Sequence, residues 1–193
     1  MHNQGIRITG PDGAAYELGH PMLMSVGRVP LGRVDRVHLR NRGTEVHFER
    51  FTPTAVMQAE PRNVGAWLFY EACAHLVRFH PQVQLISFES SRPMSGAGDP
   101  ALQAAARVAA LECIGATDIL VKPLQSGEIL VSGCWAYNER NLRDLEAVLE
   151  AQRALYRDAP IGGHIQRRRM PFVNARAMLG QWLQRDAQRT AAK

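Results

Sequence analysis

Two runs of alternating apolar and polar residues constrain the fold of this chain more than any other feature. They span residues 33–40 and 44–51, and Asn41-Arg42-Gly43 stands between them. Alternation with a period of two is typical of a strand that buries one face, and a short turn containing glycine joins neighbouring antiparallel strands. The pattern therefore predicts an antiparallel hairpin that belongs to a sheet.

Titratable residues fall on one face of this hairpin. If residues 42–43 form a two-residue loop, Arg36 lies opposite Glu49, and His38 lies opposite His47. Two histidines can be a fragment of a metal site, but no third ligand is in view. We therefore interpret the pair as part of a partly solvated sheet face and predict no metal.

An amphipathic helix is predicted over residues 64–80. Its apolar residues recur at intervals of three and four, which places them on one face, and Pro81 ends it. The apolar stripe consists of Leu68, Ala72, Leu76 and Phe79.

The segments that flank the hairpin and this helix complete an α/β fold. Residues 6–9 and 14–18 flank a Pro-Asp-Gly turn and are predicted to be strands, whereas the Gly- and Pro-rich residues 19–32 are predicted to be irregular. Further along we predict a strand over residues 83–88, a helix from Asp99-Pro100 to Gly115, and strands over residues 117–121 and 128–137. A third helix capped by Asn141 and a final helical segment over residues 175–188 follow.

These elements predict a domain over residues 1–137 with a mixed, mostly antiparallel central sheet flanked by helices. Residues 138–193 are predicted to be a helical extension packed on the same domain.

The composition narrows the class of partner. The net charge is +5, and only Arg167-Arg168-Arg169 forms a basic cluster, so no nucleic-acid partner is expected. No stretch approaches the roughly 20 apolar residues that cross a bilayer, and the first residues do not resemble a signal peptide, so we expect a cytoplasmic protein without a membrane partner. Cys73, Cys113 and Cys134 stand singly in apolar runs and are expected to be buried thiols.

The segment that leads into the predicted helix has the form of an anion-binding turn. In Arg62-Asn63-Val64-Gly65-Ala66-Trp67, an Arg-x-x-Gly pattern precedes the amphipathic residues. The first turn of a helix leaves backbone N–H groups unpaired at the positive end of the helix dipole. A phosphate or pyrophosphate can therefore bind there.

The order of elements from residue 44 to residue 137 resembles the second half of the GNAT-type N-acyltransferase fold. In that superfamily a Gln/Arg-x-x-Gly-x-Gly/Ala turn between the central strand and its helix holds the pyrophosphate of acyl-CoA. The resemblance implies acyl-CoA as co-substrate, bound by Arg62, Asn63, Val64, Gly65 and Ala66. Trp67 occupies the position where the family has a small residue, so its indole must point away from the turn or obstruct it.

A weaker similarity points to the acyl-homoserine-lactone synthase branch of the same fold. It is carried by Phe48-Glu49-Arg50-Phe51 and by residues 127–135. Those synthases have an N-terminal region rich in Trp, and no Trp precedes Trp67 here, so we do not expect that activity. Acetyltransferases of this fold also place two acceptor-binding helices between their first two strands, and residues 19–32 are too short and too broken for both.

Acyl transfer from a thioester to an amine needs a base for the ammonium and an acid for the leaving thiolate. Glu49 and Glu89 are candidates for the base because both lie near strand ends where the cofactor cleft of this fold opens. The alternative is that Glu49 pairs with Arg36 and that Glu89 is solvated.

The candidate for the acid is less direct. The resemblance implies a Tyr on the helix after the splayed strand, but residues 99–113 contain none, so Tyr137, or Ser90 and Ser91, are the substitutes. Cys134 lies in an apolar strand without an adjacent Lys or Arg, and we interpret it as a core thiol rather than a nucleophile.

Two functions remain open. The first is acyl-CoA-dependent transfer of an acyl group to an amine of a small molecule or a protein. The second is a catalytically inactive GNAT-like protein that acts as a binding, regulatory or secretion-associated module, with its C-terminal helices forming a homodimer or binding a partner.

Overall fold

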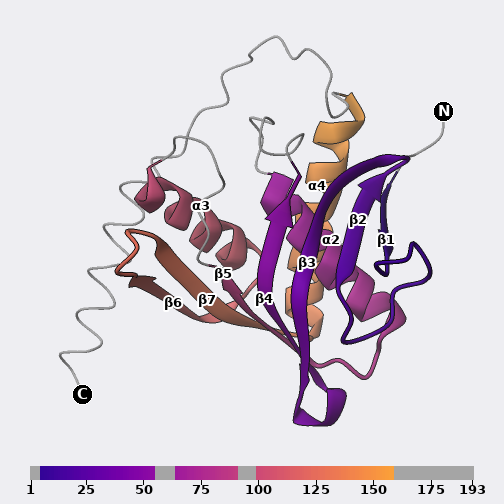
Figure 1. Ribbon diagram of the computed structural model, residues 1–193, viewed down its shortest axis with the longest axis horizontal. Coiled ribbons are helices and arrows are strands. Elements are labelled where there is room, and N and C mark those ends of the chain that lie inside the picture. The colour runs from indigo at the N-terminus through magenta and orange to yellow at the C-terminus, as the bar shows by residue number, and fades with distance from the viewer. Residues whose placement is uncertain (1–4, 55–63, 91–98, 159–193) are drawn as a thin grey trace.

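The computed structural model describes residues 5–54, 64–90 and 99–158. They form a seven-stranded sheet in the order β1-β2-β3-β4-β5-β7-β6 (Figure 1). The strands are β1 (Ile6–Thr9), β2 (Met22–Val26), β3 (Val29–Arg40), β4 (Glu45–Pro53), β5 (Leu85–Ser90), β6 (Thr117–Pro123) and β7 (Ile129–Ala136). Neighbouring strands are antiparallel except β4 and β5, which are parallel, so the predicted mixed, mostly antiparallel sheet is confirmed.

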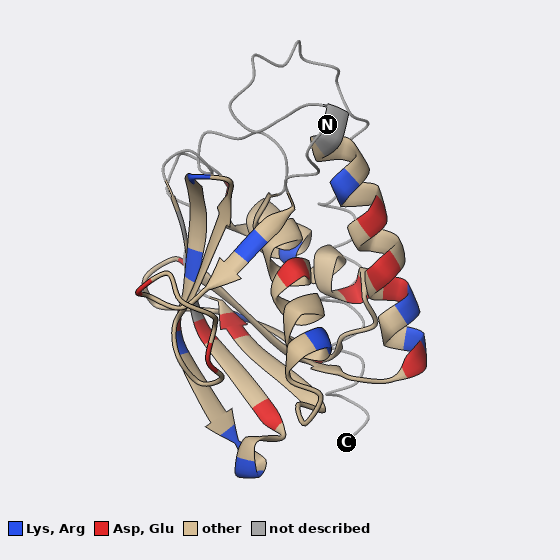
Figure 2. Ribbon diagram, turned by 90° about the vertical axis from the view of Figure 1, so that its right-hand side faces the viewer, with Lys and Arg blue, Asp and Glu red and all other residues tan. Residues whose placement is uncertain are grey.

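Three described helices cover one face of the sheet. They are α2 (Val64–Phe79), α3 (Pro100–Cys113) and α4 (Glu139–Asp158). Helix α4 packs against α2 and α3, so α2 lies between the sheet and α4 (Figure 2). The core between the sheet and the helices contains the fully buried Leu68, Leu76, Ile86 and Trp135. Phe79, which we predicted for the buried stripe, is 58% exposed because it is the last residue of α2.

The hairpin of β3 and β4 has the predicted register. His38 is the partner of His47, and Arg40 is the partner of Glu45. The loop is wider than the predicted two residues, because residues 41–43 form a short 3-10 turn in which Arg42 has a φ of 57°.

The N-terminal strands differ from the prediction. Residues 14–18 are not a strand, and β1 pairs instead with β2, inside the segment that we predicted to be irregular. The reason lies at Gly27, whose φ of 57° allows a two-residue loop between the paired residues Val26 and Val29. Tyr16 is buried, and its ring contacts His75 of α2, so residues 14–18 pack on the helix instead of pairing with β1.

The predicted boundaries of α3 are confirmed. The Asp99 carboxylate accepts a hydrogen bond from the Ala101 amide at 2.9 Å, and Pro100 is the first helical residue. Gly115 follows the helix with a φ of 76°.

Helix α4 begins two residues before the predicted Asn141 because Asn138 provides the cap. The Asn138 side chain accepts a hydrogen bond from the Asn141 amide at 2.9 Å. Asn141 itself is buried, and its Nδ2 donates to the Ala136 carbonyl at 2.8 Å. The predicted helix over residues 175–188 and the basic cluster at 167–169 lie outside the described residues.

Cys73 is buried and Cys134 is partly buried, but Cys113 is exposed, so the expectation of three buried thiols is wrong for the last residue of α3. None of the described helices is long and apolar enough to cross a membrane.

Candidate functional site

β4 and β5 form the only parallel pair of the described sheet, and their pairing ends before either strand does. β4 and β5 are paired from Glu45 with Leu85 to Phe48 with Phe88. Both strands continue beyond that point, β4 to Pro53 and β5 to Ser90, without pairing to each other. Glu49 and Glu89 are therefore the first residues after the two strands separate, which brings together the two predicted base candidates.

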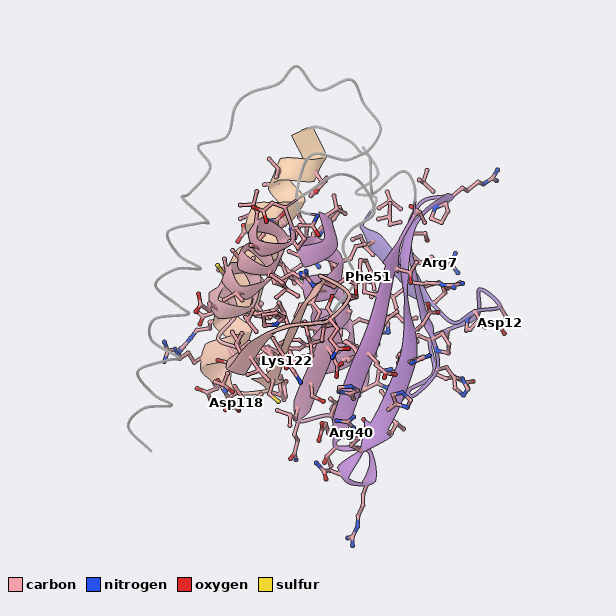
Figure 3. The ribbon with its side chains drawn as sticks, turned by 60° about the vertical axis from the view of Figure 1, so that its left-hand side comes forward. Arg7, Asp12, Arg40, Phe51, Asp118 and Lys122 are labelled. Carbon is pink, nitrogen blue, oxygen red and sulfur yellow. The ribbon has the colours of Figure 1, made fainter. Side chains whose placement is uncertain are left out.

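The face of the sheet opposite the helices carries polar side chains, and we call it the polar face. Val46, Phe48, Ile86 and Phe88 point into the core, and the residues between them point to the polar face. Its members are Arg36, His38 and Arg40 on β3, Glu45, His47 and Glu49 on β4, and Ser87 and Glu89 on β5. Arg40 on β3 and Asp118 on β6 lie toward the same end of the strands, at the bottom of Figure 3, and both charges act on the pKa of Cys134 on β7.

Glu49 is held by two partners from β3. Its Oε2 accepts a hydrogen bond from Arg36 Nη1 at 3.4 Å and lies 3.3 Å from His38 Nε2. The hydrogen bond from His38, followed by the charge of Arg36, lowers the pKa of the Glu49 carboxyl below its usual value, so the group is an anion at neutral pH. The predicted pairing with Arg36 is confirmed, and the carboxylate remains 37% exposed.

A chain of three buried side chains crosses from β4 to β5 just before the strands separate. The Ser87 hydroxyl donates to Glu45 Oε1 at 2.6 Å, and His47 Nδ1 lies 2.9 Å from Ser87 Oγ. The other carboxylate oxygen of Glu45 accepts a hydrogen bond from Asn41 Nδ2 at 2.7 Å. We interpreted His47 as partly solvated, but it is buried together with Glu45 and Ser87.

The environment of His47 favours its neutral form. Burial is the largest cause that lowers its pKa below the usual value, and the charge of Arg40 acts in the same direction. The charges of Glu89 and Glu49 oppose this effect, which places both carboxylates within electrostatic reach of the imidazole.

The predicted acyl-CoA turn is described only in part. Arg62 and Asn63 lie outside the described residues, and α2 begins at Val64, whose side chain is buried. Gly65 and Ala66 follow in the first turn of the helix and are half-buried. The assignment of this turn to the pyrophosphate stays a prediction.

Trp67 points away from the sheet and into the contact between α2 and α4. Its ring stacks on Tyr156 of α4, with 4.1 Å between the ring centroids and 14° between the planes. Its Nε1–H donates to Glu71 Oε1 at 3.0 Å. Because α4 lies on the side of α2 away from the sheet, the indole does not occupy the space between β4 and β5 (Figure 2).

Tyr137 does not share the site of Glu49 and Glu89. It follows Ala136, the partner of Leu85 at the start of β5, and its amide donates to the Gln84 carbonyl at 2.8 Å. Glu89 lies at the other end of β5, which at about 3.3 Å per residue is more than 10 Å away. The predicted acid role therefore has no support from this position.

The remaining candidates for acid or nucleophile are Ser90, Ser91 and Cys134. Ser90 is half-buried, and its carbonyl accepts a hydrogen bond from Arg107 Nη1 at 2.8 Å. Ser91 lies outside the described residues. Cys134 is only partly buried and is the partner of Ser87, so it lies on the polar face and not in the core as predicted. Burial is the main cause that raises the pKa of its thiol, which does not favour a nucleophile. No three His, Cys, Asp or Glu side chains are grouped as metal ligands in the described part of the chain.

The topology gives the chain a GNAT-type N-acyltransferase fold. From β4 to β7 the elements follow the order strand, helix, strand, helix, strand, strand that the sequence predicted. The one parallel pair lies at the centre of this order and separates after Phe48 and Phe88. Within the described residues, no helix stands between β1 and β2, where acetyltransferases of this fold place their acceptor-binding helices.

Several solved acetyltransferase structures are similar to this chain. The N-terminal domain of the ribosomal-protein-alanine acetyltransferase of Clostridium acetobutylicum is 12% identical, with a TM-score of 0.45 over 70% of this chain and 94% of that one. The spermidine/spermine N-acetyltransferase of Vibrio cholerae is 8% identical, with a TM-score of 0.44 over 66% of this chain and 72% of that one.

An acetyltransferase of Thermus thermophilus is 11% identical, with a TM-score of 0.36, and the match covers 61% of this chain and 64% of that one. This chain thus spans less than two thirds of the Thermus protein. No protein-family model and no curated protein matches the sequence.

Proposed function

We propose that this protein transfers an acyl group from acyl-CoA to an amine. The observation that carries the proposal is the position of Glu49 and Glu89, which are the first residues after β4 and β5 separate. Two carboxylates at this point attract an ammonium group, and the anionic state of Glu49 makes it ready to accept a hydrogen bond or a proton.

The start of α2 supports the acyl-CoA half of the proposal. α2 follows β4 in the chain, so its positive dipole end and its unpaired N–H groups face the same end of the sheet as Glu49. Trp67, the residue that departs from the small-residue pattern, is withdrawn into the contact with α4. The pyrophosphate would be held by residues 62–66.

The reaction has a simple proton balance. A base at the polar face takes one proton from the ammonium, and the neutral nitrogen attacks the thioester carbonyl, so that a C–N bond forms and the C–S bond breaks. The second proton of the nitrogen leaves with the thiolate as free thiol. Glu49 and Glu89 hold the ammonium during this step and are the first candidates for the base.

A second function has support from a different observation. The described residues between β1 and β2 contain no helix that could form an acceptor pocket, and α3 has no Tyr to act as acid. A GNAT-like protein that binds a ligand or a partner without turnover fits both features. Its C-terminal helices would then bind a partner or a second copy of the chain.

Calorimetry and a thiol-release assay separate the two functions. We expect acetyl-CoA or a longer acyl-CoA to bind, and at least one amine from a panel of polyamines, amino-acid amides and peptide N-termini to release thiol. At amine concentrations below KM, the variants Glu49→Gln and Glu89→Gln should lose most of this activity, whereas Glu150→Gln on the exposed side of α4 should keep it. No binding at millimolar acyl-CoA would refute the transferase, and binding without thiol release for any amine would favour the second function.

A further inference from the structure

With Glu45 as a carboxylate, which can only accept hydrogen bonds, the chain of Glu45, Ser87 and His47 has only one consistent arrangement of protons. A serine hydroxyl carries a single proton, and Ser87 donates it to Glu45 Oε1 at 2.6 Å. Ser87 Oγ can therefore only accept from His47 Nδ1, which lies 2.9 Å away. His47 must carry its proton on Nδ1, so in the neutral ring Nε2 bears the free lone pair.

Burial makes this arrangement rigid. Glu45 is 8% exposed, His47 8% and Ser87 7%, and the parallel pairing holds His47 and Ser87 as direct partners. Asn41 fixes the second oxygen of Glu45, and Arg40 Nη1 lies 3.8 Å from the first. Among the described residues, His47 Nε2 makes no hydrogen bond.

We propose that His47 Nε2 takes the proton of the acceptor amine, with Ser87 and Glu45 as positioning residues that set its tautomer and stabilise the imidazolium. The inference rests on the proposed acyltransfer and assigns its base. The ammonium N–H bond breaks, the Nε2–H bond forms, and the charge that develops on the ring is balanced by Glu45 through the Ser87 hydroxyl. The proton then passes to solvent before the next turnover.

Glu49 keeps a different task in this assignment. Its lowered pKa makes its carboxylate a weak base but a good partner for a cation. An imidazole is intrinsically a stronger base than a carboxylate. His47 stands one residue before Phe48, the last residue of β4 that pairs with β5, which puts it next to Glu49. Glu49 therefore binds the ammonium, and His47 deprotonates it.

The titratable groups around His47 come from four strands. Arg40 and His38 on β3 disfavour its protonation, whereas Glu49 on β4 and Glu89 on β5 favour it. On β7, Cys134 lies opposite Ser87, and its raised pKa keeps the thiol neutral. Burial remains the largest influence, so the imidazole is a free base at neutral pH.

The tautomer can be tested without any substrate. In long-range ¹H–¹⁵N spectra of the labelled full chain at pH 7, we expect His47 as the Nδ1–H tautomer. Ser87→Ala should shift the population toward Nε2–H, while His20, whose side chain is 62% exposed, keeps its signals in both proteins. An Nε2–H tautomer or an imidazolium at His47 in the wild type would overturn the assignment.

Kinetics then test the role of His47. With acetyl-CoA and the best amine of the panel, His47→Gln should lower kcat by at least about 100-fold, change KM little, and remove the acidic limb of the pH profile of kcat. Glu49→Gln should mainly raise KM. Glu45→Gln keeps the size of the side chain, so a shifted acidic limb in this variant reports the charge and not a folding defect.

The two proposals fail in different ways. If His47→Gln retains kcat and the acidic limb, His47 is not the base, and the acyltransfer itself stands. If the wild type neither binds acetyl-CoA nor releases thiol, the transferase is refuted and the proton transfer assigned to His47 falls with it. His20→Gln serves as the matched control and should behave as the wild type.

Discussion

Arg153 on α4 and Glu71 on α2 form a two-pronged ion pair. Arg153 Nε donates to Glu71 Oε1 at 2.8 Å, and Nη2 donates to Oε2 at 2.7 Å. The Glu71 side chain is only 8% exposed, and its Oε1 also accepts the Trp67 indole N–H. The orientation of Trp67 at the start of α2 therefore depends on a residue of α4.

Loss of the Glu71 carboxylate should destabilise the fold. In Glu71→Ala the buried Trp67 N–H loses its acceptor, whereas Arg153, which is 50% exposed, can return to water. We expect the free energy of unfolding to fall by about 1–3 kcal/mol. Urea unfolding followed by tryptophan fluorescence measures this. Glu150 is an exposed residue of α4, and Glu150→Ala should change the free energy of unfolding by no more than about 0.5 kcal/mol. Equal effects in both variants would contradict a stabilising role of the Glu71 carboxylate.

Two glycines provide a matched test of backbone strain and crowding. Gly115 has a φ of 76° and Gly127 a φ of 81°, but a Cβ at position 115 would collide with the Asn141 side chain, whereas position 127 is surrounded by open space. Gly127→Ala should cost about 1–2 kcal/mol for the left-handed conformation, and Gly115→Ala should cost clearly more. In an Asn141→Ala background the two costs should become similar. Thermal unfolding of the six proteins, three in each background, checks this, and equal costs in the wild-type background would disprove the crowding.

Acid should weaken the contact between the N-terminal segment and α2. Burial, together with the charge of His80, lowers the pKa of His75 to about 4, and the His75 ring contacts Tyr16. As the pH falls from about 6.5 to about 4, the unfolded chain binds a proton at this position and the folded chain does not, so stability is lost. The contribution of His75 is up to roughly 3 kcal/mol, since one pKa unit corresponds to about 1.4 kcal/mol.

The variant His75→Phe keeps a ring and removes the titration. Its free energy of unfolding should fall less between these two pH values than that of the wild type, and the remaining slope should include His80, whose pKa burial also lowers. His20→Gln is the control because its side chain is exposed. Parallel slopes for His75→Phe and the wild type would rule out this contribution.

The three thiols should react with iodoacetamide in order of exposure. Cys113 is exposed and should be alkylated first at pH 8. Cys134 should react more slowly because burial raises its pKa. Cys73 is buried, which also raises its pKa, and it should react only when the chain unfolds. Mass spectrometry of digested samples gives the order, and early modification of Cys73 would contradict the packing of α2.

The local patterns predicted the elements that depend on neighbouring residues. The alternation on either side of Asn41-Arg42-Gly43 is a property of short segments, and the His38–His47 register followed from it. β2 was missed because its strand of only five residues lies among glycines and prolines, and only the positive φ of Gly27 makes the hairpin with β3 possible.

The sequence predicted only those residues of the candidate site that lie near the ends of strands. Glu49 and Glu89 were recognised because each stands near the end of an apolar strand. The link from Ser87 to His47 and Glu45 joins residues 40 and 42 positions apart, and it exists only through the parallel pairing of β4 with β5. No local pattern reports such a contact, and the same is true of the partners of Trp67 on α4.

The contact between α2 and α4 also has a consequence for folding during synthesis on the ribosome. Glu71 and Arg153 are separated by 82 positions in the sequence, and Trp67 and Tyr156 are separated by more. Until α4 has been synthesised, the side of α2 that faces away from the sheet exposes the Trp67 indole and the Glu71 carboxylate without their α4 partners. A nascent chain is therefore expected to need shielding by chaperones during this interval, and the start of α2 acquires its final surroundings only late in translation.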